Sequence, residues 1–177
     1  MSRGTSGDPS GDRIVSSSHL ADGGVPALSE FEYGLILSTN AFNRWIVRCM
    51  AAAGYPDFNP LDVLVIHSVN HRARDKRLAD ICFVLNIEDS HLVNYALKKL
   101  ARAGLVEGHK RGKETVYRTT AEGAEACARY RAVRESCLVD SVRALGDFGD
   151  REIESIARFL RALSGLYDQA ARAATSL

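Results

Sequence analysis

The segment from Asp75 to Arg118 contains two short helical patterns and then a hairpin pattern, and no other feature of the 177-residue chain restricts its fold so strongly. The first pattern is DKRLADICFVLNI. Four of its apolar side chains fall on one face at helical spacing: Leu78, Ile81, Cys82 and Leu85. The residues from Asn86 to Glu88 interrupt the pattern, because asparagine adopts turn conformations at little cost. We therefore predict a short helix followed by a turn.

The second helical pattern is DSHLVNYALKKLARAG. Asp89 is a candidate N-cap, because its carboxylate can accept hydrogen bonds from the free N–H groups of the first turn. Gly104 is a typical helix stop. The predicted buried stripe consists of Val93, Ala96, Leu97 and Leu100. The opposite, solvent-facing side then carries Ser90, His91, Asn94, Tyr95 and Lys98.

This solvent-facing side has the chemistry of a helix that enters a DNA major groove. Asparagine can pair bidentately with adenine, and serine or histidine can contact several base edges. An ordinary solvated helix face has a similar composition, so the helix alone leaves both interpretations open.

The segment LVEGHKRGKETVYRTT predicts a strand, a tight turn and a second strand. Gly112 provides the positive φ that such a turn needs. The predicted tip consists of His109, Lys110, Arg111, Gly112 and Lys113. Lysine on an edge strand can be present simply to prevent aggregation, without any role in binding. Directly after two helices, however, these cations are typical of the wing of a winged helix-turn-helix, where they clamp phosphates or the minor groove.

The charge distribution favours the same interpretation. Residues 67 to 118 contain eleven Lys or Arg and six Asp or Glu, which gives this segment a charge of +5. The whole chain has a charge of +1, so the remainder has a charge of −4. A polyanion would be attracted to the basic middle of the chain. We therefore add Arg74 and Lys76 to the predicted DNA contacts.

Taken in order, these motifs resemble the MarR family of bacterial winged helix-turn-helix transcription regulators. The resemblance extends over about residues 31 to 170 and includes FNPLDVLVIHSV, RLADICFVLNI, KKLARAGLVE, the wing, TTAEG and DFGDREI. It implies a mainly α fold, a homodimer bound to a palindromic operator, and repression that a small molecule or oxidation relieves. It also implies an effector pocket, for which the candidates here are Trp45, Tyr55, Phe58 and His67.

The chain departs from the family pattern at two places. The wing GHKRGKE is short and lacks the Asp-Arg pair that family wings commonly carry near the tip. The groove-facing side of the second helix has His91, Asn94 and Tyr95 where arginine is frequent in the family. The family's base preference therefore cannot be transferred to this chain.

Apolar stripes at both ends of the chain predict dimerisation helices over about residues 31–53 and 120–174. One stripe contains Phe31, Leu35, Ser38, Phe42, Trp45 and Cys49. The other contains Ile153, Ile156, Leu160, Leu163, Tyr167 and Ala170. Such stripes also occur in the core of a single chain. A dimer is favoured because helices that flank a small independent unit have little else to bury against.

Three helix starts can be predicted from residues at or near the helix cap. Asn59, Pro60 and Asp62 predict the start of an apolar central helix. Thr119 and Glu122 form a candidate capping box for a long helix that extends to about Leu145. Asp150 is a candidate N-cap for the last helix.

Residues 1–28 are rich in Ser, Gly and Asp, and we expect them to form a disordered arm before a single winged-helix domain at residues 29–177. Within that domain, residues 59–118 form the predicted DNA-binding unit. The arm lacks the apolar run of a signal peptide, and no segment is apolar enough to span a membrane. We therefore expect a cytoplasmic protein.

The remaining reactive side chains predict no catalytic or metal site. The four cysteines at positions 49, 82, 127 and 137 form no CxxC motif, so inert buried thiols are expected. A cysteine-based redox sensor, with Cys127 or Cys137, remains an alternative. His67 and His71 have metal-ligand spacing but no acidic or cysteine partner nearby. We therefore expect no enzyme activity and no cofactor. A winged-helix protein-interaction module without DNA binding is the other alternative.

Overall fold

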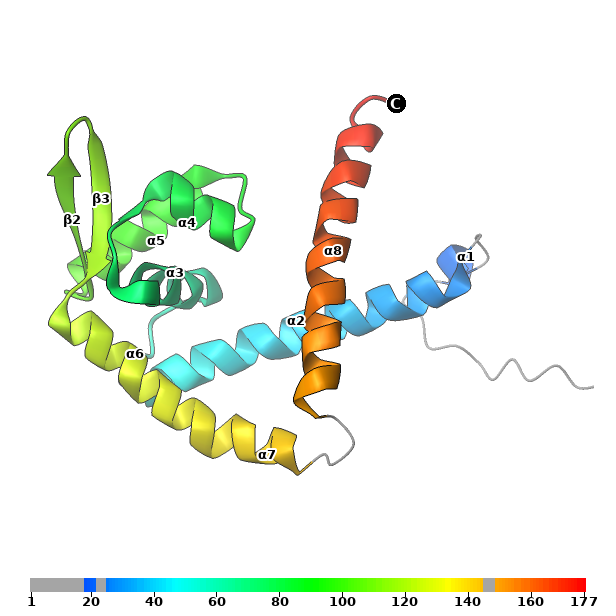
Figure 1. The fold of residues 1–177 in the computed structure, drawn as a ribbon, viewed down its shortest axis with the longest axis horizontal. Helices are drawn as coiled ribbons and strands as arrows, with labels where there is room; N and C mark the ends of the chain where they lie inside the picture. The colour runs from blue at the N-terminus through cyan, green and yellow to red at the C-terminus, as the bar shows by residue number, and fades with distance from the viewer. Residues whose placement is uncertain (1–17, 22–24, 145–148) are drawn as a thin grey trace, which may run out of the picture. The chain divides into compact units, whose positions relative to one another are not determined.

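The computed structural model describes residues 18–21, 25–144 and 149–177, which form two compact units divided between Cys127 and Ala128. The predicted class is confirmed, because the fold is mainly α with a small antiparallel sheet (Figure 1). The predicted winged helix lies entirely in the first unit. Each unit is described by itself below.

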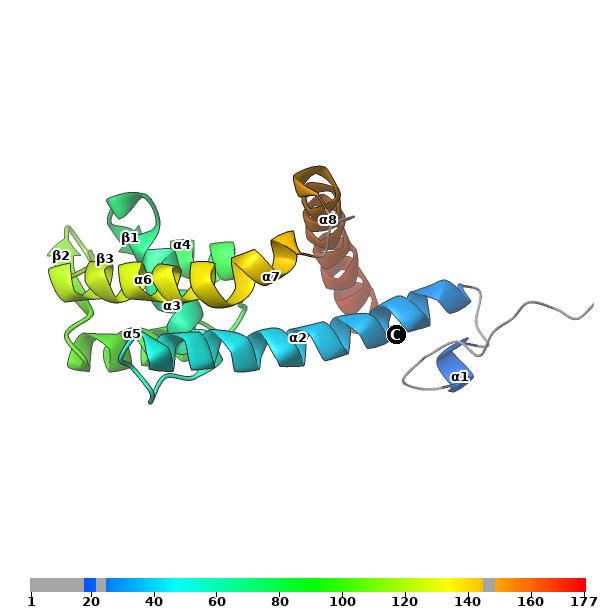
Figure 2. The same ribbon diagram turned by 90° about the horizontal axis from the view of Figure 1, so that it is seen from below.

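The first unit begins with a short helix and a long one, α1 (Ser18–Ala21) and α2 (Pro26–Ala52). The long helix is unbroken (Figure 2). Both helices include residues that were predicted to belong to a disordered arm, so that prediction was wrong for residues 18–21 and 26–28. Pro26 opens α2 because its fixed φ suits the first helical position, and Ser29 Oγ donates a hydrogen bond to Leu20 O at 2.8 Å. Residues 1–17 and 22–24 of the predicted arm lie outside the described residues.

The central helix α3 (Pro60–Asn70) begins where the sequence predicted. Asn59 Oδ1 accepts a hydrogen bond from Asp62 N, and Asp62 Oδ2 accepts one from Asn59 N, each at 2.9 Å. Four apolar side chains of the helix are almost fully buried: Val63, Val65, Ile66 and Val69. The helix contacts α2, α4 (Leu78–Leu85), α5 (Ser90–Arg102) and β3 (Glu114–Thr119), so it forms the centre of the first unit.

A short strand, β1 (Lys76–Arg77), precedes α4. The prediction that the first helix includes these two residues was therefore wrong. Lys76 pairs with Tyr117 and Arg77 with Val116 of β3, so backbone pairing with a distant strand holds them extended. The helix begins only after Arg77, whose N–H donates to Asp80 Oδ2 at 3.0 Å. At its end Asn86 has a φ of 53°, which confirms the predicted turn.

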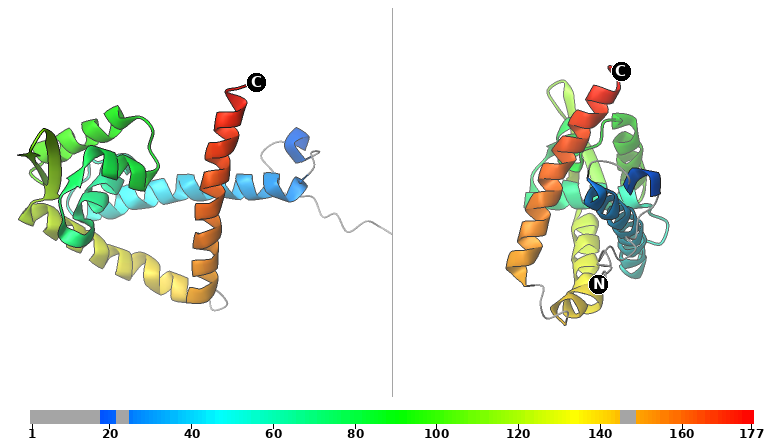
Figure 3. Two further views of the ribbon diagram at one scale, coloured as in Figure 1. Left: turned by 45° about the horizontal axis from the view of Figure 1, so that its top comes forward. Right: turned by 90° about the vertical axis from the view of Figure 1, so that its right-hand side faces the viewer.

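The helix α5 and the strands β2 (Val106–Arg111) and β3 complete the predicted unit. Asp89 caps α5 by accepting a hydrogen bond from His91 N at 2.9 Å, and Gly104 ends the helix with a φ of 74°. The sheet order is β1-β3-β2, with all pairs antiparallel. Arg111 pairs with Glu114 across a tight turn in which Gly112 has a φ of 63°. The strands β2 and β3 project as a two-stranded wing (Figure 3).

The helix α6 (Ala121–Arg134) begins in the first unit and continues into the second. Its cap is Thr120 rather than the predicted Thr119, because Thr119 still belongs to β3. Thr120 Oγ1 accepts a hydrogen bond from Gly123 N at 3.0 Å and donates one to Gly104 O at 2.7 Å. The helical path continues through a π-helical turn at Glu135–Val139 and α7 (Asp140–Arg143). No helix within the described ranges is long and apolar enough to cross a membrane.

The last helix, α8 (Asp150–Ala174), belongs to the second unit. Gly149 occupies its N-cap position and Asp150 is the first helical residue, so the predicted cap was displaced by one position. The carboxylate of Asp150 still lies in the first turn, where a negative charge is favourable.

Gly123 allows the close contact between α6 and Leu105, in the segment between α5 and β2. A Cβ atom at this position would lie 1.9 Å from Leu105 O, and that carbonyl also accepts a hydrogen bond from Thr120 N at 3.1 Å. A side chain here would collide with backbone that cannot rotate away. Gly165 in α8 has no atom within 4 Å of the same hypothetical Cβ and therefore provides a matched control.

We predict that Gly123→Ala lowers the free energy of unfolding by about 2–4 kcal/mol, because α6 must shift away from Leu105. Gly165→Ala should raise it by about 0.5–1 kcal/mol, because alanine favours a helix interior. Urea unfolding followed by circular dichroism measures both. Equal effects of the two substitutions would contradict the assigned contact.

Candidate nucleic-acid interface

The solvent-facing side of α5 forms the candidate reading surface. His91, Tyr95, Lys98 and Arg102 are all exposed and follow one another at helical spacing along its centre. Ser90 is also exposed, whereas Asn94 is half-buried at the edge of this surface. The structure thus places all five predicted α5 residues on one side of the helix. Sequence reasoning missed Arg102, although its position eleven residues after His91 follows the same helical period.

A buried ion pair fixes the opposite side of α5. Lys99 Nζ lies 2.6 Å from Asp62 Oδ2 and donates a hydrogen bond to Asp57 O at 2.7 Å. The side chain of Asp62 is 1% exposed and that of Lys99 is 25% exposed. The ammonium also lies 5.3 Å from the centroid of the Phe58 ring. These contacts join α5 to the start of α3 and set the rotation of α5 about its axis.

We predict that Lys99→Met lowers the free energy of unfolding by about 2–4 kcal/mol, because it leaves the Asp62 carboxylate buried without a cation. Lys98→Met is the matched control, because its exposed neighbouring ammonium should contribute less than about 0.5 kcal/mol. Urea denaturation of both variants tests this difference. If Lys98→Met is the more destabilising change, the assigned rotation of α5 is wrong.

The two faces of the wing carry different residues. Because strand side chains alternate, Lys110 shares a face with its partner Thr115 and with Tyr117, whereas Arg111 shares the other face with Glu114. A Cβ on Gly108 would lie 3.1 Å from Tyr117 Cε1, so the absence of a side chain there lets the Tyr117 ring lie across the strands. The predicted wing cations Lys110, Arg111 and Lys113 are all exposed.

His109 does not lie at the tip of the wing but within β2, where it is half-buried. Its Nε2 lies 3.1 Å from Asp75 Oδ2 in the segment before β1. This contact passes over β3, because the sheet order is β1-β3-β2, and it connects β2 of the wing to the segment before β1. We therefore interpret His109 as a support for the wing rather than as a groove contact.

Lys76 also differs from its predicted role as a DNA contact. The residue is 6% exposed, and its ammonium donates hydrogen bonds to His71 O and to Arg74 O, the latter at 3.2 Å. Burial, followed by repulsion from Arg74, lowers the pKa of this ammonium. The side chain therefore holds the loop after α3, which argues against a DNA contact. Arg72, with a φ of 60°, and Arg74 are exposed on this loop.

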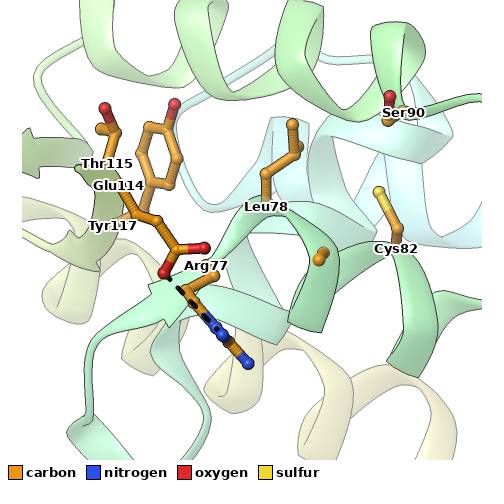
Figure 4. Close-up of a pocket in the computed structure, with 8 residues that line it drawn as sticks. Arg77, Leu78, Cys82, Ser90, Glu114, Thr115 and Tyr117 are labelled. Carbon is orange, nitrogen blue, oxygen red and sulfur yellow. Dashed lines mark ion pairs between the residues drawn. The ribbon is translucent and has the colours of Figure 1, made fainter.

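A groove of about 610 Å³ separates the start of α5 from the wing (Figure 4). Leu78, Ala79 and Cys82 line it from α4, Ser90 lines it from α5, and Thr115 and Tyr117 line it from β3. Its surface is therefore largely apolar, with hydroxyl groups toward α5 and the wing. Sequence reasoning did not identify this groove, because its walls come from segments that are distant in the chain.

Arg77 and Glu114 close one end of the groove, where Arg77 Nη1 lies 3.8 Å from Glu114 Oε2 (Figure 4). Arg77 also pairs with Asp80 at 3.0 Å. The hydrogen bond from Arg77 lowers the pKa of the Asp80 carboxyl and raises that of the guanidinium. The charge of Arg77 is thus directed toward two carboxylates of its own unit.

The predicted effector residues occupy several places in the first unit. The rings of Tyr55 and Phe58 stack with centroids 5.7 Å apart, and Tyr55 Oη donates a hydrogen bond to Glu122 Oε1. His67 is half-buried within α3, where burial lowers its pKa, and Trp45 is half-buried in α2. The described contacts therefore bring Tyr55 and Phe58 together in a packed stack with Lys99 rather than around a cavity.

The four cysteines are free thiols in different surroundings. Cys49 is buried, and burial raises the pKa of Cys127 to about 11. At neutral pH Cys127 is therefore a thiol, which argues against its predicted alternative role as a redox sensor. Cys82 is half-buried in the groove beside Ser90, and Cys137 is exposed in the π-helical turn.

Comparison with known proteins supports this arrangement. Residues 58–123 match the family of winged helix DNA-binding domains. No curated protein sequence matches the chain. A MarR family regulator from Neisseria meningitidis has a similar solved structure, with a TM-score of 0.61 and 20% identity over 81% of this chain and 95% of that one.

Two further solved structures have the same fold. A MarR family transcriptional regulator from a Rhodococcus species has a TM-score of 0.57 and 14% identity, over 76% of this chain and 91% of that one. Wild-type MarR from Escherichia coli, in its apo form, has a TM-score of 0.53 and 17% identity, over 73% and 93%. Residues 58–123 therefore match the winged helix DNA-binding domains, and the chain has the fold of the MarR family regulators.

Proposed function

We propose that this protein is a transcription regulator that binds duplex DNA as a homodimer, with α5 in the major groove and the wing at the minor groove. The observation that carries the proposal is the exposed row of His91, Tyr95, Lys98 and Arg102 beside a cation-tipped wing. A helix with this exposure presents donors and cations to base edges and phosphates. The fold that the chain shares with known transcription regulators supports the same function.

A mobility-shift experiment tests DNA binding directly. Duplexes that the protein selects from a random pool are compared with unselected duplexes at a stated, near-physiological salt concentration. A higher affinity for the selected duplexes supports the proposal. Equal, weak binding to both pools would instead favour a module that docks another protein.

We predict that replacing Lys110 and Arg111 together by alanine weakens binding to selected and random duplexes alike. The loss of two exposed cations should reduce the slope of log affinity against log salt by up to about two. Asn94→Ala removes a directional donor and acceptor, so it should cost about 1–3 kcal/mol on the selected site and much less on random DNA. Fluorescence anisotropy at several salt concentrations distinguishes the two effects. If both variants weaken both classes of DNA by one common factor, Asn94 does not read bases.

A second copy of the chain accounts for the exposed apolar side chains of the terminal helices. On α2 these are Leu28, Ile36, Leu37 and Phe42, with exposures of 41–52%. On α8 they are Ile153, Ile156, Phe159, Leu160, Leu166 and Tyr167, with exposures of 37–61%. Within the predicted α8 stripe, Leu163 differs from these residues in being only 9% exposed. We infer that the remaining apolar surface is buried in a homodimer.

We predict that Leu160→Asp yields monomers, because a carboxylate would be buried in the apolar contact between two copies. Gly165→Asp is the matched control, because it adds the same charge at an exposed position of α8 that faces away from these apolar side chains. Light scattering after size exclusion gives the mass of each variant, and circular dichroism shows whether the chain is folded. A Leu160→Asp dimer as stable as the wild type would exclude this contact.

We further propose that a small molecule modulates DNA binding. The groove beside Ser90 supports it, because its volume and largely apolar lining suit a small apolar ligand. A ligand there would contact both the start of α5 and Tyr117 of the wing. It could therefore change the spacing of the two DNA-binding elements.

A further inference from the structure

The first half of α5 lacks the side chains that most often read guanine. Residues 90–97 have the sequence SHLVNYAL and contain no arginine or lysine. The commonest base-specific contact in a major groove is made by one of these two cations with guanine O6 and N7. The N-terminal part of a recognition helix usually contacts the bases. This chain must therefore read its site mainly by other means.

Two large apolar groups are exposed in this half of α5. Leu92 is 53% exposed and Tyr95 is 61% exposed. They are three residues apart and so lie side by side on the helix surface. Val93, Ala96 and Leu97, the apolar side chains that hold α5 in the unit, are by contrast at most 1% exposed, and Leu92 lies at the edge of this buried face. Leu92 and Tyr95 are thus available to a partner.

We propose that Leu92 and Tyr95 contact the methyl group of thymine, so that the preferred half-site contains thymines at defined positions. The inference rests on the proposed DNA-binding function. Thymine is the one standard base that presents an apolar group in the major groove, and an apolar side chain against it removes both surfaces from water. Leu92 was not among the residues predicted from the sequence to contact DNA.

The cations of α5 are placed for a different role. Lys98 and Arg102 are exposed one and two turns beyond Tyr95, on the same side of the helix. Their positive charge attracts any phosphate backbone, whatever the base sequence. Apolar contacts near the start of α5 would thus provide selectivity, and the cations near its end would provide affinity.

Replacement of thymine by deoxyuridine tests this division of roles, because the change removes the methyl group and keeps base pairing. Duplexes carrying the sequence that the wild-type protein selects are made with single thymines replaced in turn. Wild-type affinity should fall about four-fold at one or two positions, as expected for one buried methyl group. Leu92→Ala should bind the thymine duplex more weakly and should lose this sensitivity at one such position. Leu92→Met, which keeps an apolar side chain, should retain it.

Val84→Ala is the matched control, because Val84 is an apolar residue of α4 with 69% exposure and should leave the methyl effect unchanged. The proposal is overturned if the wild type binds all thymine and deoxyuridine duplexes equally. It is also overturned if Leu92→Ala keeps the full methyl effect at every position. If the wild type selects no duplex at all, the proposed DNA-binding function itself is wrong. If it binds selected duplexes but is insensitive to the methyl groups, only the thymine contact is wrong.

Discussion

The buried pair of Asp62 and Lys99 is the interaction on which the candidate interface depends. The carboxylate is also part of the capping box at the start of α3, so one side chain both starts the central helix and binds α5. A buried charge without a partner is costly, so α5 can rotate little without losing the pair. Because one side of α5 is fixed in this way, the identity of the exposed residues on its other side is fixed as well.

The wing is positioned by a different kind of constraint. The strand β1 is only two residues long, yet it connects the start of α4 to β3 by backbone pairing. Side-chain pairs reinforce this connection, with Asp75 bound to His109 and Arg77 bound to Glu114. The wing, α4 and α5 are therefore connected, and a change at the groove beside Arg77 would reach both α5 and the wing.

The sequence predicted those features that local chemistry determines. The caps Asn59 and Asp89 and the turn residues Gly104 and Gly112 act within a few residues of their own position, so their roles could be read directly. Two of the wrong predictions concern residues whose partners are distant in the chain. In the sequence alone Lys76 is like any exposed cation, because the pairing of β1 with β3 that places it cannot be seen there. The cap of α6 was assigned one residue too early because β3 extends through Thr119.

The same limit applies to the charge of the candidate site. The sequence gives residues 67–118 a charge of +5, but the structure directs several of these cations inward or toward carboxylates of the same unit. Lys99 binds Asp62, Arg77 binds Asp80, Arg118 binds Glu107, and Lys76 holds backbone carbonyls. The exposed cations that remain are Arg72, Arg74, Lys98, Arg102, Lys110, Arg111 and Lys113. Because each phosphate contact contributes a nearly constant increment to the salt dependence of binding, this smaller set would determine how strongly salt weakens the proposed DNA complex.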